Sequence, residues 1–124
     1  MAQIKDIIEI ENRRTDDRER SIVYLFKEGS FLRAYEWSAW LICMFINEFK
    51  VTHKRIKSLD QSVAFVGFPQ TSLSKYTPEG CEVLQVQNDL FQIQLSGIAE
   101  SKMKELDSAT AFEDWKRSFP LIEH

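Results

Sequence analysis

The chain has few of the residues that interrupt regular structure and few of those that most often carry enzyme chemistry. Its 124 residues include four Gly, three Pro, two Cys and two His. So little Gly and Pro argues against a disordered or collagen-like protein, and two isolated cysteines fit no zinc-binding spacing. Hydrophobic residues make up 44% of the chain. We therefore expect one domain with a substantial core, in which Cys43 and Cys81 are buried free thiols.

Long apolar runs and a strong net charge are also missing. The longest uncharged apolar run, Trp37 to Ile46, is interrupted only by Ser38, and it is about half of the roughly 18 residues that cross a bilayer. The first residues carry acids early and contain no apolar segment of a secretory signal. A net charge of −3 predicts no strong attraction of the whole molecule to nucleic acid or anionic membranes. We expect a cytoplasmic protein with no membrane partner.

Motifs of the common enzyme classes are absent from the sequence. It contains no phosphate-binding loop, no dinucleotide-binding glycine pattern and no metalloprotease or serine hydrolase motif. His53 lies among basic residues and is expected on an exposed strand, while His124 is the last residue. The acidic pairs Asp16-Asp17 and Glu113-Asp114 have no third ligand at a recognisable spacing. The sequence thus predicts a protein that is not an enzyme, with no catalytic residue, metal or cofactor.

The N-terminal third contains a helical pattern followed by a hairpin. Ile4, Ile7 and Ile8 have helical spacing, and residues 1–20 are expected to form a charged helical extension. Ile22 to Phe26 is short, β-branched and aromatic, and Phe31 to Tyr35 alternates large and polar residues. Because Gly29-Ser30 separates them, the two segments predict antiparallel strands joined by a tight turn.

A helix and two further strands are expected in the middle of the chain. Apolar residues recur at helical spacing from Glu36 to Asn47, which predicts a helix that packs Trp40, Leu41 and Met44 into the core. Lys50 to Lys57 is rich in basic and β-branched residues and predicts an exposed strand. Ser62 to Phe68 is almost continuously apolar, which is typical of a buried central strand that ends at Pro69.

The last part of the chain predicts one short helix, two strands and a helical tail. Gln70 to Tyr76 is expected to form the short helix. Cys81 to Val86 and Leu90 to Leu95 alternate in the manner of strands on either side of Asn88-Asp89. Ile98 to Phe119 has the composition of helices that pack back on the sheet. The expected fold is therefore mixed α/β: a central mixed sheet over residues 22–95, flanked by helices at 1–20 and 98–119.

Two segments of the chain resemble a known family. The stretch IVYLFKEGSFLRAYEWSAW, which begins at Ile22, is similar to an apolar strand, glycine turn and phenylalanine-containing return strand of the N-terminal mismatch-recognition domain of MutS mismatch-repair proteins. SVAFVGFPQTSLSKY resembles that domain's apolar strand ending in a Gly-apolar-Pro corner. The resemblance covers Ile22 to Val86 and implies a mixed α/β fold like MutS domain I.

The same resemblance implies a contact with nucleic acid, with one departure from the family pattern. In the family a Phe-x-Glu motif stacks on a mispaired base and hydrogen-bonds to it, and this chain has Phe31 and Arg33 at those positions. A guanidinium donates to phosphates or guanine edges instead of sharing a proton with a base. The chain is too short to contain the family's clamp and ATPase regions. Small stand-alone proteins similar to this domain accompany reverse transcriptases in bacterial diversity-generating retroelements, which implies an accessory role.

Charge distribution adds a second indication of a binding site. Residues 21–57 carry a net charge of +3, whereas residues 58–124 carry −5. We therefore expect a DNA- or RNA-binding module whose stacking platform and local positive charge come from six residues. These are Phe31, Arg33, Lys50, Lys54, Arg55 and Lys57. A solvated strand face has the same basic composition, and Phe31 is alternatively a core aromatic.

Two other interpretations stay open at this point. A protein-interaction adaptor would dock a partner, such as a reverse transcriptase or a second copy, through the acidic tail and Phe112, Trp115 and Phe119. Those aromatics alternatively pack a helix onto the sheet. A small nuclease is the least favoured, because Glu48-Phe49-Lys50 has no convincing partner acid.

Overall fold

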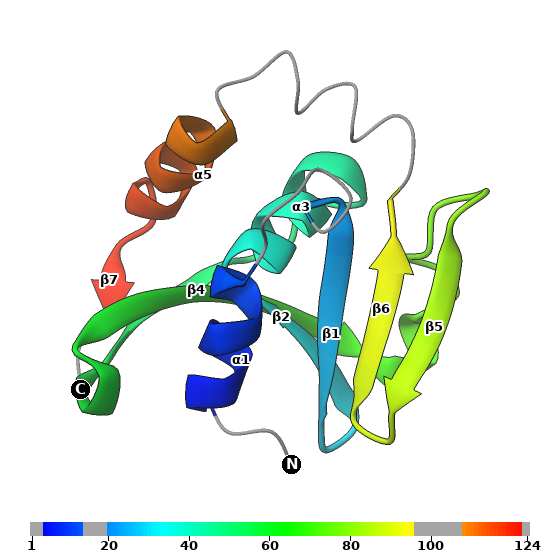
Figure 1. Ribbon diagram of the computed structural model, residues 1–124. Coiled ribbons are helices and arrows are strands. Elements are labelled where there is room, and N and C mark those ends of the chain that lie inside the picture. Colours follow the sequence, from blue (N-terminus) through cyan, green and yellow to red (C-terminus); the bar gives the residue numbers. More distant parts are fainter. Residues whose placement is uncertain (1–3, 14–19, 96–107, 123–124) are drawn as a thin grey trace.

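Seven strands form one mixed sheet with helices on both faces (Figure 1). The computed structural model describes residues 4–13, 20–95 and 108–122. Strand order is β5-β6-β1-β2-β4-β3-β7, and every neighbouring pair is antiparallel except β3 and β7. This confirms the predicted α/β class. The strands are β1 Ile22–Glu28, β2 Phe31–Tyr35, β3 Thr52–Ile56, β4 Gln61–Pro69, β5 Glu82–Gln87, β6 Leu90–Gln94 and β7 Leu121–Ile122.

The hairpin predicted around Gly29-Ser30 is confirmed. β1 and β2 pair in antiparallel register, with Glu28 opposite Phe31 and Phe26 opposite Arg33. Gly29 has φ +64°, a left-handed conformation that glycine adopts without a steric penalty. The turn therefore determines which side chains of β1 and β2 share a face.

Helix α3, Trp37–Phe45, covers one face of the sheet, here called the α3 face. Trp40 and Leu41 are fully buried there, as predicted, together with Leu32 and Ala34 of β2. The prediction for Met44 is wrong, because its side chain is 50% exposed. Met44 lies in the last turn of α3, whereas the cover provided by the C-terminal helix reaches the first half of α3.

β4 is an interior strand that lies beside the centre of the sheet. It pairs with β2 on one side and β3 on the other, so β2 and not the predicted Ser62 to Phe68 segment is the middle strand. Pro69 is the last residue of β4, opposite Phe31, a position where a missing amide hydrogen is tolerated. The helix predicted for Gln70 to Tyr76 is a single 3₁₀ turn, η2, Gln70–Ser72.

Helix α1, Ile4–Asn12, packs on the opposite face of the sheet, here called the α1 face. Ile7 contacts a separate apolar cluster that includes Phe26, Tyr35 and Leu90. Because side chains alternate along a strand, the odd-numbered residues of β2 lie on this face and the even-numbered ones on the α3 face. The predicted N-terminal extension is thus a packed element of the core in the part that the structure describes.

The C-terminal segment packs on α3 and joins the far edge of the sheet. Helix α5, Ser108–Arg117, places Phe112 against Trp37 and Trp40, with ring centroids 5.4 and 6.3 Å apart. β7 then pairs in parallel with β3. Tail packing was expected on the sheet itself, but the aromatic contacts are with α3. Residues 98–107 of the predicted helical tail lie outside the described residues.

The strands predicted on either side of Asn88-Asp89 are confirmed as β5 and β6. β6 is largely buried, whereas most of β5 is exposed at the edge of the sheet.

None of the helices within residues 4–13, 20–95 and 108–122 combines the length and apolar character needed to span a membrane.

Candidate nucleic-acid interface

Phe31 presents an exposed aromatic ring at the start of β2. It follows the Gly29-Ser30 turn, lies opposite Glu28 and Pro69, and is 46% exposed. The alternative in which Phe31 is a core aromatic is therefore wrong. An exposed ring at the end of a hairpin is geometrically free to stack on a planar ligand.

Arg33 lies on the same face as Phe31, two residues further along β2. Its Nη1 is 3.4 Å from Oε1 of Glu28, and its guanidinium carbon is 5.2 Å from the ring centroid of Phe65. Gly67 lies opposite Arg33, and a Cβ atom at Gly67 would come within 3.2 Å of the Arg33 Cγ. The missing side chain at Gly67 thus leaves the space that Arg33 occupies.

Glu28 links Arg33 to Tyr35. The Tyr35 hydroxyl donates a hydrogen bond to Oε2 of Glu28, while Arg33 contacts the other carboxylate oxygen. Burial, and then the hydrogen bond to Glu28, raise the pKa of the Tyr35 phenol well above its usual value. Tyr35 therefore stays protonated and holds the Glu28 carboxylate in place. Arg33 has five N–H donors, and besides its 3.4 Å contact with Glu28 it interacts with the Tyr35 hydroxyl, so further donors remain for a ligand.

Lys54 shares the α1 face with Arg33 but lies at a distance from it. Lys54 is opposite Val63 and Arg33 is opposite Gly67, so the two are separated by four positions along β4 and by two strand spacings. Strand geometry converts this into about 16 Å between their Cα atoms. Lys54 and Phe31 therefore belong to one face but do not form one compact cluster.

The other predicted basic residues are placed differently. Arg55 alternates to the α3 face and donates a hydrogen bond of 2.7 Å to Asp60. Lys50 is exposed before β3 begins, and Lys57 is exposed in the 3₁₀ turn η1, Lys57–Leu59. Of the basic residues within β3, only Lys54 thus faces the same side as Phe31.

His53 is buried, which corrects the expectation of an exposed strand histidine. Its side chain is only 8% exposed. Nδ1 lies 3.1 Å from the Phe119 carbonyl oxygen and Nε2 lies 2.9 Å from Oγ of Ser62. A carbonyl only accepts, so Nδ1 carries the hydrogen and donates it to Phe119, which ties the C-terminal segment to β3.

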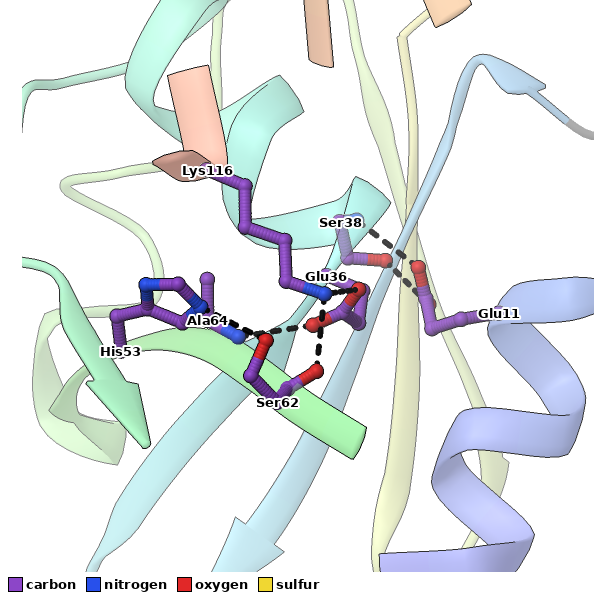
Figure 2. A network of polar contacts seen from close by, with 7 residues as sticks. All are labelled: Glu11, Glu36, Ser38, His53, Ser62, Ala64 and Lys116. Carbon is purple, nitrogen blue, oxygen red and sulfur yellow. Dashed lines mark hydrogen bonds and ion pairs between the residues drawn. The ribbon is translucent and has the colours of Figure 1, made fainter. Parts of the chain in front are cut away.

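Lys116 forms a second tie between α5 and the sheet (Figure 2). Its Nζ donates to Oε2 of Glu36 at 2.8 Å and to the Ser62 carbonyl at 2.9 Å. The other Glu36 oxygen accepts from the Ala64 amide at 2.8 Å. The backbone of Glu36 has φ +52°, a conformation that residues other than glycine rarely adopt, and these contacts stabilise it. We infer that the hydrogen bonds of His53 and Lys116 anchor the C-terminal segment to the sheet.

The three aromatic residues of the proposed adaptor surface contact other aromatic residues of the same chain. Phe112, Trp115 and Phe119 form a series of ring contacts that continues to Trp37 and Trp40 of α3. The alternative in which they pack a helix is therefore supported, although the helix packs on α3. Glu113 and Asp114 are exposed on the outer side of α5.

Other candidate sites are separate from Phe31. An open pocket of about 660 Å³ lies between the segment from Gln70 to Gly80 and the start of β5, where Leu73, Cys81 and Val83 border the α3-face cluster. Cys43 and Cys81 are free, as predicted, but only partly buried. Burial raises the pKa of the Cys43 thiol. In the described ranges, no three His, Cys, Asp or Glu residues gather as metal ligands do; Asp16-Asp17 lies outside them.

Glu28, Tyr35 and Phe65 are the parts of this site that the sequence interpretation missed. The position of Glu28 was predictable from the sequence, because a two-residue hairpin turn at Gly29-Ser30 places residues 28 and 31 opposite each other. Phe65 joins the site through the pairing of β2 with β4, which no local sequence pattern reveals.

Comparison with known proteins identifies no relative: the chain matches no known protein family, no curated protein and no solved structure.

Proposed function

We propose that this protein is a non-enzymatic nucleic-acid-binding module in which Phe31 stacks on a base. The observation that carries the proposal is that Phe31 is 46% exposed, on the same face as Arg33. Base stacking on aromatic side chains tolerates any sequence, and the Arg33 guanidinium supplies donors for phosphate or base edges. Lys54 on the same face extends the contact along the backbone of the ligand.

A relationship to the MutS mismatch-recognition domain is part of this proposal. Arg33 replaces the glutamate of the family motif, but the register brings Glu28 opposite Phe31 from the neighbouring strand. A carboxylate is therefore present next to the stacking ring, although Tyr35 and Arg33 both contact it. In this proposal the protein acts as an accessory protein of a reverse transcriptase in a diversity-generating retroelement.

Replacing Phe31 with alanine is expected to weaken binding about 5- to 150-fold, because one stacked base contributes about 1 to 3 kcal/mol. Stability should change little, since the ring is exposed. Fluorescence anisotropy with labelled single-stranded DNA, single-stranded RNA and matched or mispaired duplexes measures the effect. Met44→Ala is the matched control, because Met44 is similarly exposed on α3. Equal affinity of the wild type and Phe31→Ala for every probe would contradict the proposed stacking.

Lys54 and Arg55 provide a second test, because they lie on opposite faces of β3. Lys54→Glu is expected to weaken binding to all sequences and to reduce the slope of log K against log salt by about 0.7 to 0.9, the contribution of one phosphate contact. Arg55→Glu, with the same change in charge, should leave the slope unchanged. Titrations at several salt concentrations measure both slopes. Equal slopes for the two variants would show that the α1 face is not the binding face.

The second candidate function is a protein-interaction adaptor. It is favoured by β7, where Leu121 and Ile122 are 44% and 42% exposed. Such a surface suits a protein partner, such as the reverse transcriptase, better than a phosphate backbone. Undetectable binding of every nucleic-acid probe at low salt would favour this function over the first.

A further inference from the structure

The two edges of the sheet differ in how they are protected against pairing with another chain. On one side β3 carries Lys54 and Arg55, and the two-residue β7 lies outside it. On the other side the edge strand is β5, with the sequence EVLQVQ. It contains no Lys, Arg or Pro, and its single charge is Glu82 at its first position. Basic residues, prolines, very short strands and β-bulges are the usual devices that keep edges apart. Of these, β5 has only a register irregularity after Gln85.

Leu84 is the exposed apolar residue in the regular part of this edge. Residues 82–85 pair with β6 without interruption, and a register shift occurs only between Gln85 and Gln87. Leu84 is 43% exposed and lies opposite Gln92, on the α1 face. Within residues 4–13, 20–95 and 108–122, no strand pairs with the outer side of β5. An edge strand of this kind with an exposed leucine near its middle is suited to adding another strand.

We propose that β5 pairs antiparallel with β5 of a second copy of this chain, with the two Leu84 residues opposite each other. In this register Val83 lies opposite Gln85, and the two Leu84 side chains meet on the α1 face beside the two-fold axis. Residues that oppose each other also share a face, as an antiparallel ladder requires.

The position of Glu82 favours a second copy in this orientation. An antiparallel pair centred on Leu84 places the two Glu82 residues at opposite ends, four positions apart along the strand, which is about 13 Å. This exceeds the screening length of about 8 Å at physiological salt, so their repulsion is small. A parallel pair would bring the two carboxylates side by side. Of the two pairings centred on Leu84, only the antiparallel one thus avoids the repulsion between the two Glu82 carboxylates.

The dimer is expected to be weak and to present two binding faces together. A contact of about five residues a side is smaller than the roughly 800 Å² per partner of a standard interface, so the dimer should dissociate on dilution. A two-fold axis perpendicular to the sheet leaves both α1 faces on the same side. Two copies of Phe31 would then face one ligand, which raises its apparent affinity.

A charge-swap experiment at Leu84 tests the proposed register. Leu84→Lys alone and Leu84→Glu alone each place like charges opposite each other and should raise the dissociation constant of the dimer at least ~10-fold. An equimolar mixture of the two variants should form a heterodimer again, because opposite charges then face each other. Analytical ultracentrifugation over a concentration series, without nucleic acid, measures all three, so the result does not depend on the proposed function.

Two controls distinguish edge pairing from other association. Met44→Lys adds the same charge at a similarly exposed residue of α3 and should leave the dimer unchanged. Hydrogen exchange at high and low protein concentration should show added protection of backbone amides in β5. A wild type that stays monomeric over the whole series would overturn the proposal. Single variants that dimerise as well as the wild type, or a mixture that stays monomeric, would also overturn it.

Discussion

Trp40→Ala is expected to lower the free energy of unfolding by about 3 to 5 kcal/mol, the usual cost of truncating a buried tryptophan to alanine. The Trp40 side chain is only 1% exposed and belongs to the cluster between α3 and the sheet. Its ring lies 4.7 Å from that of Trp37 and 6.3 Å from that of Phe112, measured between centroids. The substitution removes both the contact with the sheet and the contact with α5.

Chemical denaturation followed by circular dichroism measures the loss in stability. Met44→Ala serves as the control on the same helix, because half of its side chain is already in water and little apolar area is lost. A Trp40→Ala variant that unfolds at the same denaturant concentration as the wild type would show that α3 does not pack through Trp40.

Glu11→Ala is expected to lower the free energy of unfolding by about 2 to 4 kcal/mol, because it removes the carboxylate that accepts from two buried donors of Ser38. The Glu11 side chain is 5% exposed, and Ser38 is fully buried. One carboxylate oxygen accepts from the Ser38 amide at 3.0 Å and the other from the Ser38 hydroxyl at 2.8 Å (Figure 2). The Ser38 hydroxyl oxygen in turn accepts from the Tyr24 amide at 2.9 Å.

This contact also completes the N-terminus of α3. Glu36, at the N-cap position, makes no capping hydrogen bond with its side chain, so the carboxylate of Glu11 fills this role from α1. A negative charge at a helix N-terminus is favoured by the helix dipole. The loss of Glu11 should therefore loosen both α1 and the start of α3.

Thermal and chemical unfolding of Glu11→Ala, Glu11→Gln and Glu9→Ala measures this effect. Glutamine keeps an acceptor oxygen but loses the second one, so its cost should be intermediate. Glu9 lies on the same helix, is exposed and pairs with exposed Arg13 at 2.6 Å, so Glu9→Ala should change stability much less than Glu11→Ala. Equal stabilities of Glu11→Ala and Glu9→Ala would contradict the capping role.

Local sequence patterns were sufficient for the hairpin and for the α3 helix. Gly29-Ser30 between two β-branched and aromatic segments specifies a turn that only a few neighbouring residues need to form. The helical spacing of Trp37, Trp40 and Leu41 likewise depends on a period that repeats within one segment. Phe31 and Arg33 share a face for the same reason, since alternation along β2 is a local property.

Contacts between distant segments required the tertiary structure. The carbonyl of Phe119, 66 residues away, accepts a hydrogen bond from Nδ1 of the buried His53, and α3 is capped by Glu11, 27 residues before Ser38. Met44 is exposed because α5 covers only part of α3, and Lys54 lies about 16 Å from Arg33 because two strand spacings and four positions separate them.

The sequence alone therefore determined the main helices and strands, the turn at Gly29-Ser30, and Phe31, Arg33 and Lys54 as residues of the candidate site. Only the tertiary structure decided that Phe31 is exposed, that Glu28 and Tyr35 accompany Arg33, and that β5 is an open edge. The physical reason is the separation in sequence of the residues that interact: a hydrophobic period or a turn is specified by side chains within a few residues of each other. Burial and strand order depend instead on which segments, far apart in the chain, cover one another when the whole sheet assembles.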